Sequence, residues 1–242
     1  MKLKVMTFNI QHGRNHNLES DVIDLDAVVS NVTLQKPDIV GLNEVRSGKH
    51  FDHFSGLSNQ PAYIAEKFGY DYRFGKSITI FGDCEYGNAV FSKFRILNSE
   101  VIAIPDPDEK LKGYYYESRS LIRTDYEIEG KRLTVLNSHF GLAPNEQTNA
   151  VDLVFSIVKE VENPVILMGD FNMTPENENV KRLSGIFEDV HRSLNKAIPT
   201  YPSNSPDERI DYIFVKGLKV ESADTVKKIV SDHYAITAVL EF

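Results

Sequence analysis

Polar residues that could bind a metal ion or a phosphate group lie at the ends of several apolar runs in this chain. The clearest cases are Gly169-Asp170-Phe171-Asn172 and Ser231-Asp232-His233. Both place acid, amide or imidazole side chains where a buried strand is expected to meet a loop. Rigid scaffolds commonly present metal-assisted hydrolytic chemistry at such strand ends. The two motifs therefore indicate an enzyme that acts on phosphate esters.

Four further apolar runs carry polar residues of the same kind. They are Thr7-Phe8-Asn9, Leu42-Asn43-Glu44, Leu136-Asn137-Ser138-His139 and Arg209-Ile210-Asp211-Tyr212. Taken alone, each has a structural explanation: Asn9 could cap a turn, and His139 could be a hydrogen-bonded structural residue. Asp170 and Asn172 could likewise form an Asx turn. As a set, however, they supply the carboxylate and amide oxygens that Mg²⁺ and Mn²⁺ prefer, and zinc is a poorer match.

The segments that must position these residues follow strand and helix patterns. Two amphipathic segments predict helices at about residues 21–35 and 146–162. Polar stretches at residues 47–60 and 105–118 predict long surface loops. Short apolar runs predict strands buried on both faces, so that helices must cover the sheets. These runs are residues 3–8, 38–42, 89–91, 101–104, 120–124, 133–137, 165–168, 210–215 and 234–240.

Composition limits the class of protein. The chain has 242 residues, of which 41% are hydrophobic, and we expect a single catalytic domain over residues 1–242. The 27 basic and 35 acidic residues give a net charge of -8, which argues against a general polyanion binder. The single cysteine, Cys84, excludes an internal disulfide and a four-cysteine zinc site. Without a signal peptide or a membrane span, we expect a cytoplasmic monomer with no evident protein partner.

The ordered set of strand-end residues resembles the endonuclease/exonuclease/phosphatase superfamily. Its members include deoxyribonucleases, abasic-site endonucleases, inositol polyphosphate phosphatases and neutral sphingomyelinases. The residues that carry the resemblance are Asn9, Glu44, His139, Asp170 with Asn172, Asp211, and Asp232 with His233. The resemblance implies an α/β fold of the deoxyribonuclease type, a four-layer sandwich of two packed mixed β-sheets flanked by helices.

The resemblance also implies a divalent-metal site and its ligands. Glu44 would be the principal ligand for Mg²⁺ or Mn²⁺, with Asn9 and Asp232 nearby. One metal ion or two would fit the pattern equally.

Four further residues would carry out the hydrolysis. Asp170 and Asn172 would orient the attacking water and the scissile phosphate. His233, paired with Asp211, would act as a general base or stabilise the transition state. Which of Asp170 and His233 takes the proton stays open.

Three residues bear on the branch of the family and on substrate binding. His139 matches the deoxyribonuclease, sphingomyelinase and phosphatase branches, which carry a histidine at this strand end, whereas abasic-site endonucleases carry a tyrosine. Glu85 is a candidate to orient the His139 ring. Asn88 and Arg119 are candidate substrate-binding residues. Equally, Asn88 could be a turn residue, and Tyr114–Tyr116 before Arg119 could seal the loop onto the core. Lys49, His50 and His53 could touch the substrate from the loop after Glu44.

The leading hypothesis is a Mg²⁺- or Mn²⁺-dependent hydrolase that cleaves a phosphoester, most simply a phosphodiester, with an activated water. Nucleic acid and a small phosphorylated molecule are both candidate substrates, although no basic run tracks a nucleic-acid backbone. A sphingomyelinase-like or inositol-phosphatase-like enzyme is the alternative. A non-catalytic binding module on the same scaffold is the third reading, and the presence of Glu44, Asp170, Asp211 and His233 disfavours it.

Overall fold

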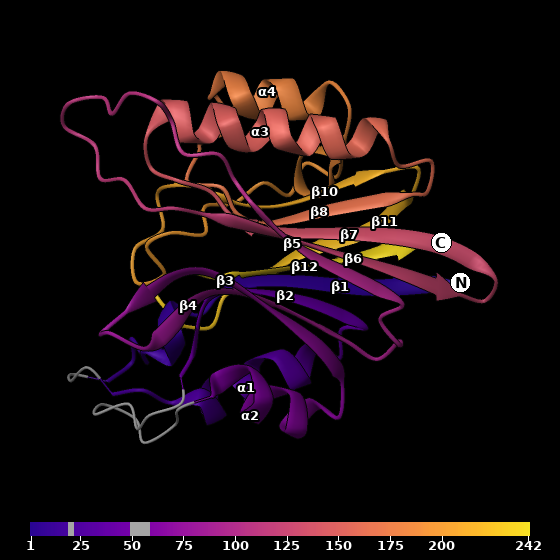
Figure 1. Cartoon of the computed structure of the whole chain (residues 1–242). Helices are drawn as coiled ribbons and strands as arrows, with labels where there is room; N and C mark the ends of the chain where they lie inside the picture. The colour runs from indigo at the N-terminus through magenta and orange to yellow at the C-terminus, as the bar shows by residue number, and fades with distance from the viewer. Residues whose placement is uncertain (19–21, 49–58) are drawn as a thin grey trace.

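Two six-stranded β-sheets pack face to face, with helices on their outer faces (Figure 1). The computed structural model describes residues 1–18, 22–48 and 59–242. Lys49, His50 and His53 lie outside the described residues. The first sheet has the order β11 (Lys219–Val226), β12 (Ala235–Glu241), β1 (Lys2–Asn9), β2 (Ile39–Ser47), β4 (Cys84–Ser92) and β3 (Asp71–Ile80). The second has the order β5 (Asn98–Ala103), β6 (Ser120–Ile128), β7 (Lys131–His139), β8 (Val165–Asp170), β10 (Asp211–Lys216) and β9 (Glu188–Asp189).

Three apolar clusters hold the four layers together. The first lies between the sheets and includes Val90 and Ile236 from one sheet and Met168 from the other. The second joins the second sheet to α3 (Pro144–Lys159) and α4 (Glu178–Ser184). The third joins the first sheet to α1 (Leu25–Gln35) and α2 (Gln60–Phe68). Each sheet is thus covered on both faces, which explains why its central strands are buried along most of their length. The expected four-layer α/β sandwich is confirmed.

The topology brings the strand ends of both sheets to one end of the molecule. β1 runs parallel to β2, and β7 runs parallel to β8, so the carboxyl ends of each pair lie side by side. β10 is antiparallel to β8, and β12 is antiparallel to β1, so each of these two strands begins at that same end. Strand direction alone therefore collects residues from six segments that are far apart in the sequence.

The predicted elements differ from the structure mainly at their boundaries. All nine predicted strands are present, most of them longer than the apolar run that indicated them. The helix expected at 21–35 begins at Leu25, because Asp24 caps it by accepting a hydrogen bond from the Ala27 N–H. The helix expected at 146–162 begins at Pro144, where Glu146 accepts a hydrogen bond from the Ala143 N–H.

The sequence patterns missed several short or exposed elements. β3 is an edge strand with few buried residues, so it has no continuous apolar run. The other missed elements are β9, β11, α2, α5 (Val190–Ser193) and a 3₁₀ turn, η1 (Gln11–Gly13). None of the helices in the described part of the chain has the length and apolar character that a bilayer crossing requires.

His191 is expected to make the fold less stable in acid. Burial of its ring, together with the Arg209 guanidinium, lowers the pKa of His191 from 6.5 to about 4. Between these values the unfolded chain binds a proton that the folded chain excludes, so the free energy of unfolding falls as the pH drops, by up to about 3 kcal/mol.

The His191→Gln variant cannot take up this proton, so comparison with it isolates the effect. In denaturant unfolding at pH 7 and at pH 4.5, wild type should lose stability relative to the variant at the lower pH. A difference in stability that is the same at both pH values would show that His191 is not the responsible group.

Candidate active site

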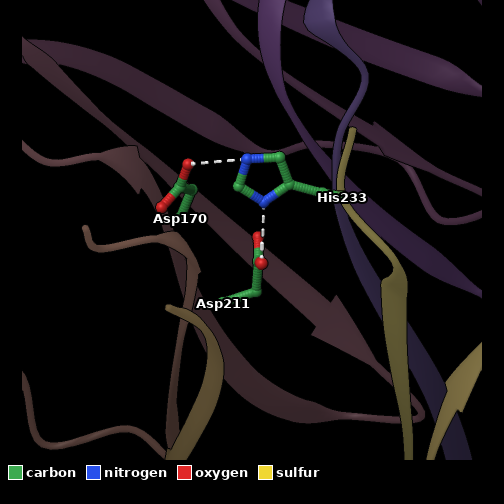
Figure 2. Close-up of side chains that lie close together, drawn as sticks. All are labelled: Asp170, Asp211 and His233. Atoms are coloured by element: carbon green, nitrogen blue, oxygen red, sulfur yellow. Dashed lines mark hydrogen bonds and ion pairs between the residues drawn. The ribbon is translucent and has the colours of Figure 1, made fainter. Parts of the chain in front are cut away.

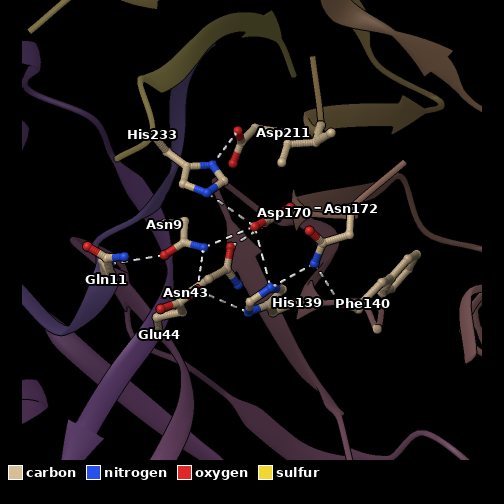
Figure 3. Close-up of polar contacts among 12 residues, drawn as sticks. Asn9, Gln11, Asn43, Glu44, His139, Phe140, Asp170, Asn172, Asp211 and His233 are labelled. Atoms are coloured by element: carbon tan, nitrogen blue, oxygen red, sulfur yellow. Dashed lines mark hydrogen bonds and ion pairs between the residues drawn. The ribbon is translucent and has the colours of Figure 1, made fainter. Parts of the chain in front are cut away.

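The strand-end residues expected to act together lie in one polar cluster at the shared end of the two sheets (Figure 3). Asn9 connects the sheets, because its Nδ2 donates to Glu44 Oε1 at 2.9 Å and to Asp170 Oδ2 at 3.0 Å. The Gln11 N–H donates to Asn9 Oδ1 at 3.0 Å and fixes the amide orientation. Asn9 is fully buried, so it is a central member of the cluster and not a solvated cap.

Glu44 projects from a β-bulge in β2. The register of β2 against β4 shifts between Leu42 and Val45, and Glu44 has a φ of 59°, in the left-handed region. The bulge directs the carboxylate toward Asn9, while the Tyr86 hydroxyl donates to Oε2 at 2.5 Å. Burial, followed by the Glu44 charge, raises the pKa of Tyr86, so the phenol keeps its proton and acts as a donor.

Asp170 ends β8 and is almost completely buried. Its backbone N–H donates to Asn43 Oδ1 at 3.0 Å, and its Oδ1 accepts from the Asn172 N–H at 3.0 Å. The Asx turn considered from the sequence is therefore present, and it places both side chains in the cluster. Gly169 before it has a φ of 144° and passes so close to Ser138 that a Cβ would lie 1.8 Å from the Ser138 carbonyl oxygen.

Asp211, His233 and Asp170 lie in a row of charged side chains, which we call the charge relay (Figure 2). Asp211 Oδ2 lies 2.9 Å from His233 Nδ1, and Asp170 Oδ2 lies 3.6 Å from His233 Nε2. The Thr200 hydroxyl donates to the same Asp211 oxygen at 2.6 Å. His233 and Asp211 come from different strand ends, so the pairing depends on the antiparallel approach of β10 and β12 to this end.

The electrostatics of the relay place a proton on the imidazole. Burial alone would lower the pKa of His233, but the Asp211 and Asp170 carboxylates outweigh burial and raise it to about 10. Burial is also the main cause that raises the pKa of Asp170 to about 7; the Asp211 charge adds to this, and the His233 charge opposes it. His233 is thus an imidazolium held between two carboxylates at neutral pH.

His139 lies on the other side of Asp170 and is neutral. Burial, and then the Arg119 and His233 charges, lower the pKa of His139 well below 6.5. Its Nδ1 lies 3.3 Å from Arg119 Nη1, and its Nε2 lies 3.0 Å from Asn172 Nδ2. Among the described residues, the carboxylates within 4.0 Å of the ring are Glu44 and Asp170. The expectation that Glu85 orients this ring is therefore wrong.

The two candidate substrate-binding residues occupy different environments. Asn88 is buried: its Oδ1 accepts from Asn43 Nδ2 at 2.8 Å, and its Nδ2 donates to the Ser120 carbonyl at 3.0 Å. Its amide thus supports the scaffold behind the cluster. Arg119 reaches the cluster beside His139, although Glu117 pairs with it at 2.7 Å.

One of the three tyrosines before Arg119 makes the sealing contact considered from the sequence. The Tyr116 hydroxyl donates to Asn145 Oδ1 at 2.9 Å and seals the loop onto α3. Tyr114 and Tyr115 are exposed.

Asp232 lies at the edge of the cluster and is half-buried. Gln11 Nε2 donates to its Oδ2 at 2.8 Å, and the Ser231 hydroxyl donates to its Oδ1 at 2.9 Å. Tyr201 covers the neighbouring imidazole, with its ring centre 4.8 Å from that of His233.

Sequence reasoning missed five residues that hold the cluster in place. A signal existed for two of them: Gln11 follows Asn9 by two positions, and Tyr86 shares a strand face with Asn88. The five are Gln11, Asn43, Tyr86, Thr200 and Tyr201.

The donor set fits a hard divalent cation. Asn9 Nδ2 joins the Glu44 and Asp170 carboxylates, Asp232 lies beyond Gln11, and the cluster contains no thiolate. The positive charge of His233 does not balance these acids, and Arg119 is already paired with Glu117.

A second grouping, Asp170, Asp211 and His233, places ligand atoms within 4.8 Å of one another. Since its Asp211 and His233 atoms bond each other, we interpret it as the charge relay and not as a metal site.

Fold and site together define a hydrolase scaffold of the deoxyribonuclease type. The chain belongs to the Endonuclease/Exonuclease/phosphatase family, whose model matches residues 6–233. Members of this family are phosphoesterase hydrolases. The family resemblance stated from the motifs is thereby confirmed.

Individual proteins resemble this chain along nearly its whole length. The chain is 27% identical over 250 aligned residues to the uncharacterized protein YbhP of Escherichia coli K12, covering 97% of this chain and 94% of YbhP. An endonuclease/exonuclease/phosphatase structure from Beutenbergia cavernae has a TM-score of 0.83 at 23% identity, covering 100% of this chain and 72% of that one.

Two further solved structures have a named activity or ligand. A mannosyl-6-phosphatase from Bacteroides thetaiotaomicron has a TM-score of 0.73 at 22% identity, covering 99% of this chain and 100% of that one. TDP2 from D. rerio, solved with a single-strand DNA product, has a TM-score of 0.74 at 19% identity, covering 100% and 99%. At these identities the structures support the fold alone.

Proposed function

We propose that the protein is a Mg²⁺- or Mn²⁺-dependent hydrolase that cleaves a phosphoester bond with an activated water. The observation that carries the proposal is the relay of Asp211, His233 and Asp170 next to the Glu44 carboxylate, which Asn9 Nδ2 joins to Asp170. Burying an imidazolium between two carboxylates is costly. A polar cluster with only a structural role would not need this arrangement.

Glu44, Asn9 and Asp232 would hold the cation. When bound, it polarises a phosphoryl oxygen and makes a coordinated water more acidic. Two further residues orient these ligands: Tyr86 bonds Glu44, and Gln11 bonds Asp232 and Asn9. Such supporting hydrogen bonds fix the direction of a ligand and tune its basicity.

Asp170 is the group that accepts the proton of the attacking water. Its pKa is raised toward neutrality, whereas His233 already carries a proton. The imidazolium stays beside Asp170 and stabilises the negative charge that develops on the phosphoryl oxygens. Asp211 holds the ring by its Nδ1, which leaves Nε2 directed toward Asp170.

The opposite wall of the cluster would bind the non-bridging oxygens of the phosphate. His139 lies there in contact with Arg119 on one side and with Asn172 on the other. Because His139 is neutral, it serves as a hydrogen-bond donor and not as a strong acid. Arg119 adds a guanidinium, which suits phosphate geometry.

The substrate class we propose is a phosphodiester, either nucleic acid or a small phosphorylated molecule. Of the two solved structures with a named activity or ligand, TDP2 with a single-strand DNA product is consistent with a nucleic-acid substrate, whereas the mannosyl-6-phosphatase is named for a phosphomonoester. A sphingomyelinase-like or inositol-phosphatase-like enzyme is the alternative within the same chemistry. The retained acids of the cluster favour either enzyme over a non-catalytic module.

A substrate panel tests the proposal. Purified protein with Mg²⁺ or Mn²⁺ is offered bis(4-nitrophenyl) phosphate, 4-nitrophenyl phosphate, single-stranded DNA, RNA, mannose 6-phosphate, an inositol phosphate and sphingomyelin. We expect metal-stimulated release from the diester, with EDTA abolishing it. Preferential cleavage of a monoester or of sphingomyelin would move the assignment to the alternative, and no turnover of any substrate would refute it.

The Glu44→Gln variant is expected to lose the cation. Removing this charge should weaken Mg²⁺ binding by at least about 100-fold, since loss of a residue that merely supports a ligand costs about 10–100-fold. Calorimetric titration of the metal-stripped protein measures this directly. Glu100→Gln, on the exposed face of β5, is the matched control and should bind as wild type does. Unchanged Mg²⁺ binding in Glu44→Gln would exclude Glu44 as a ligand.

A further inference from the structure

Tyr86 on β4 makes the two oxygens of Glu44 inequivalent. The Tyr86 hydroxyl donates to Oε2 at 2.5 Å, and a charge-assisted O–H···O⁻ bond of this length is strong. Oε1 faces the cluster, where it accepts a longer hydrogen bond from the neutral amide Nδ2 of Asn9 at 2.9 Å and lies 4.0 Å from His139 Nδ1. One oxygen of Glu44 is therefore directed at the phenol and the other at the reaction site.

The backbone on both sides of β4 fixes the position of the Tyr86 ring. The register of β2 against β4 shifts next to Glu44, and the register of β3 against β4 shifts between Lys76 and Ile78. Gly87, directly after Tyr86, passes so close to β3 that a Cβ would lie 2.0 Å from the Gly75 carbonyl oxygen. The hydroxyl thus reaches Glu44 from a strand held by neighbours on both edges.

This arrangement limits how Glu44 can bind a cation. A carboxylate whose second oxygen holds a strong hydrogen bond is directed to bind through one oxygen only. Mg²⁺ takes six ligands in near-octahedral geometry, whereas Ca²⁺ takes six to eight and commonly binds a carboxylate through both oxygens. We propose that Tyr86 is a positioning residue that makes Glu44 a one-oxygen ligand and so makes the site favour Mg²⁺ over Ca²⁺. This inference rests on the proposed metal dependence.

Calorimetric titration with Mg²⁺ and with Ca²⁺ tests the inference without relying on catalysis. The proteins are metal-stripped wild type, Tyr86→Phe and Tyr63→Phe. Tyr63 is a matched control, because its hydroxyl donates to Asp26 Oδ1 at 2.5 Å, the same kind of bond between α2 and α1. Thermal unfolding in EDTA confirms that each variant is folded at the titration temperature. If Tyr86→Phe is not folded, Tyr86→Met, which also lacks the hydroxyl, replaces it.

The expected result is a change in selectivity. In Tyr86→Phe, the ratio of the Ca²⁺ Kd to the Mg²⁺ Kd should fall about 10-fold, while Tyr63→Phe should keep the wild-type ratio. An unchanged ratio would overturn the proposal, whether both affinities stay the same or both weaken equally. Wild type that binds neither ion would refute the proposed metal dependence itself, which distinguishes that failure from loss of the Tyr86 inference alone.

Discussion

Replacing Asp170 with asparagine is expected to lower kcat by about 10³–10⁴-fold, at the upper end of what a general base contributes. The substitution keeps the size of the side chain but removes the group that accepts the proton of the attacking water. It also removes the charge that faces His233 Nε2 at 3.6 Å. The variant should fold, because asparagine can still accept the hydrogen bond from the Asn172 N–H that Asp170 Oδ1 receives.

The dependence of kcat/KM on pH gives a second test of Asp170 as the general base. Burial raises the pKa of Asp170 to about 7, so the base form of wild type accumulates as the pH rises. We therefore expect kcat/KM of wild type to climb with pH until Asp170 has lost its proton, and the residual activity of Asp170→Asn to lack that limb. Asp152→Asn, on the exposed face of α3, is the control and should retain the wild-type profile. A loss of less than about tenfold would assign the base to another group.

The sequence could predict the members of the site because each lies at the end of a strong apolar run. Asp170 and His139 end two buried strands, so their positions follow from the same pattern that predicts the strands. Parallel pairing then brings them side by side, as it does Asn9 and Asn43 in the other sheet. Features that are local in sequence therefore indicate the strands and the members of the cluster, whereas the family resemblance implies the four-layer sandwich.

The supporting contacts could not be predicted, because they depend on irregular backbone. Tyr86 reaches Glu44 through a bulge, and an apolar-run pattern contains no information on where a register shifts. Gln11 reaches Asp232 from η1, where Gln11 has a φ of 42° that its sequence does not indicate. The wrong assignment of Glu85 has the same origin, since the residue that meets His139 Nδ1 comes from the end of a long loop, at Arg119.

Replacing His233 with glutamine is expected to reduce kcat by about 10³-fold, because the imidazolium beside Asp170 is lost when the transition-state charge develops. Asp211→Asn should cost about 10²-fold. An asparagine cannot stabilise the imidazolium, and its amide can turn a donor toward His233 Nδ1, where Asp211 Oδ2 lies at 2.9 Å in wild type. Single-turnover kinetics at saturating Mg²⁺ or Mn²⁺ would measure both effects on the chemical step.

A variant that carries both Asp211→Asn and His233→Gln tests whether Asp211 and His233 act as one unit. Asp211 bonds His233 directly, so once the imidazole is gone the carboxylate has no ring to orient. Asp211→Asn combined with His233→Gln should therefore be no slower than His233→Gln alone, as is usual for residues that work together. Additive losses would mean that Asp211 contributes by a route other than His233. That outcome would contradict the relay, in which Asp211 acts only through its bond to His233 Nδ1.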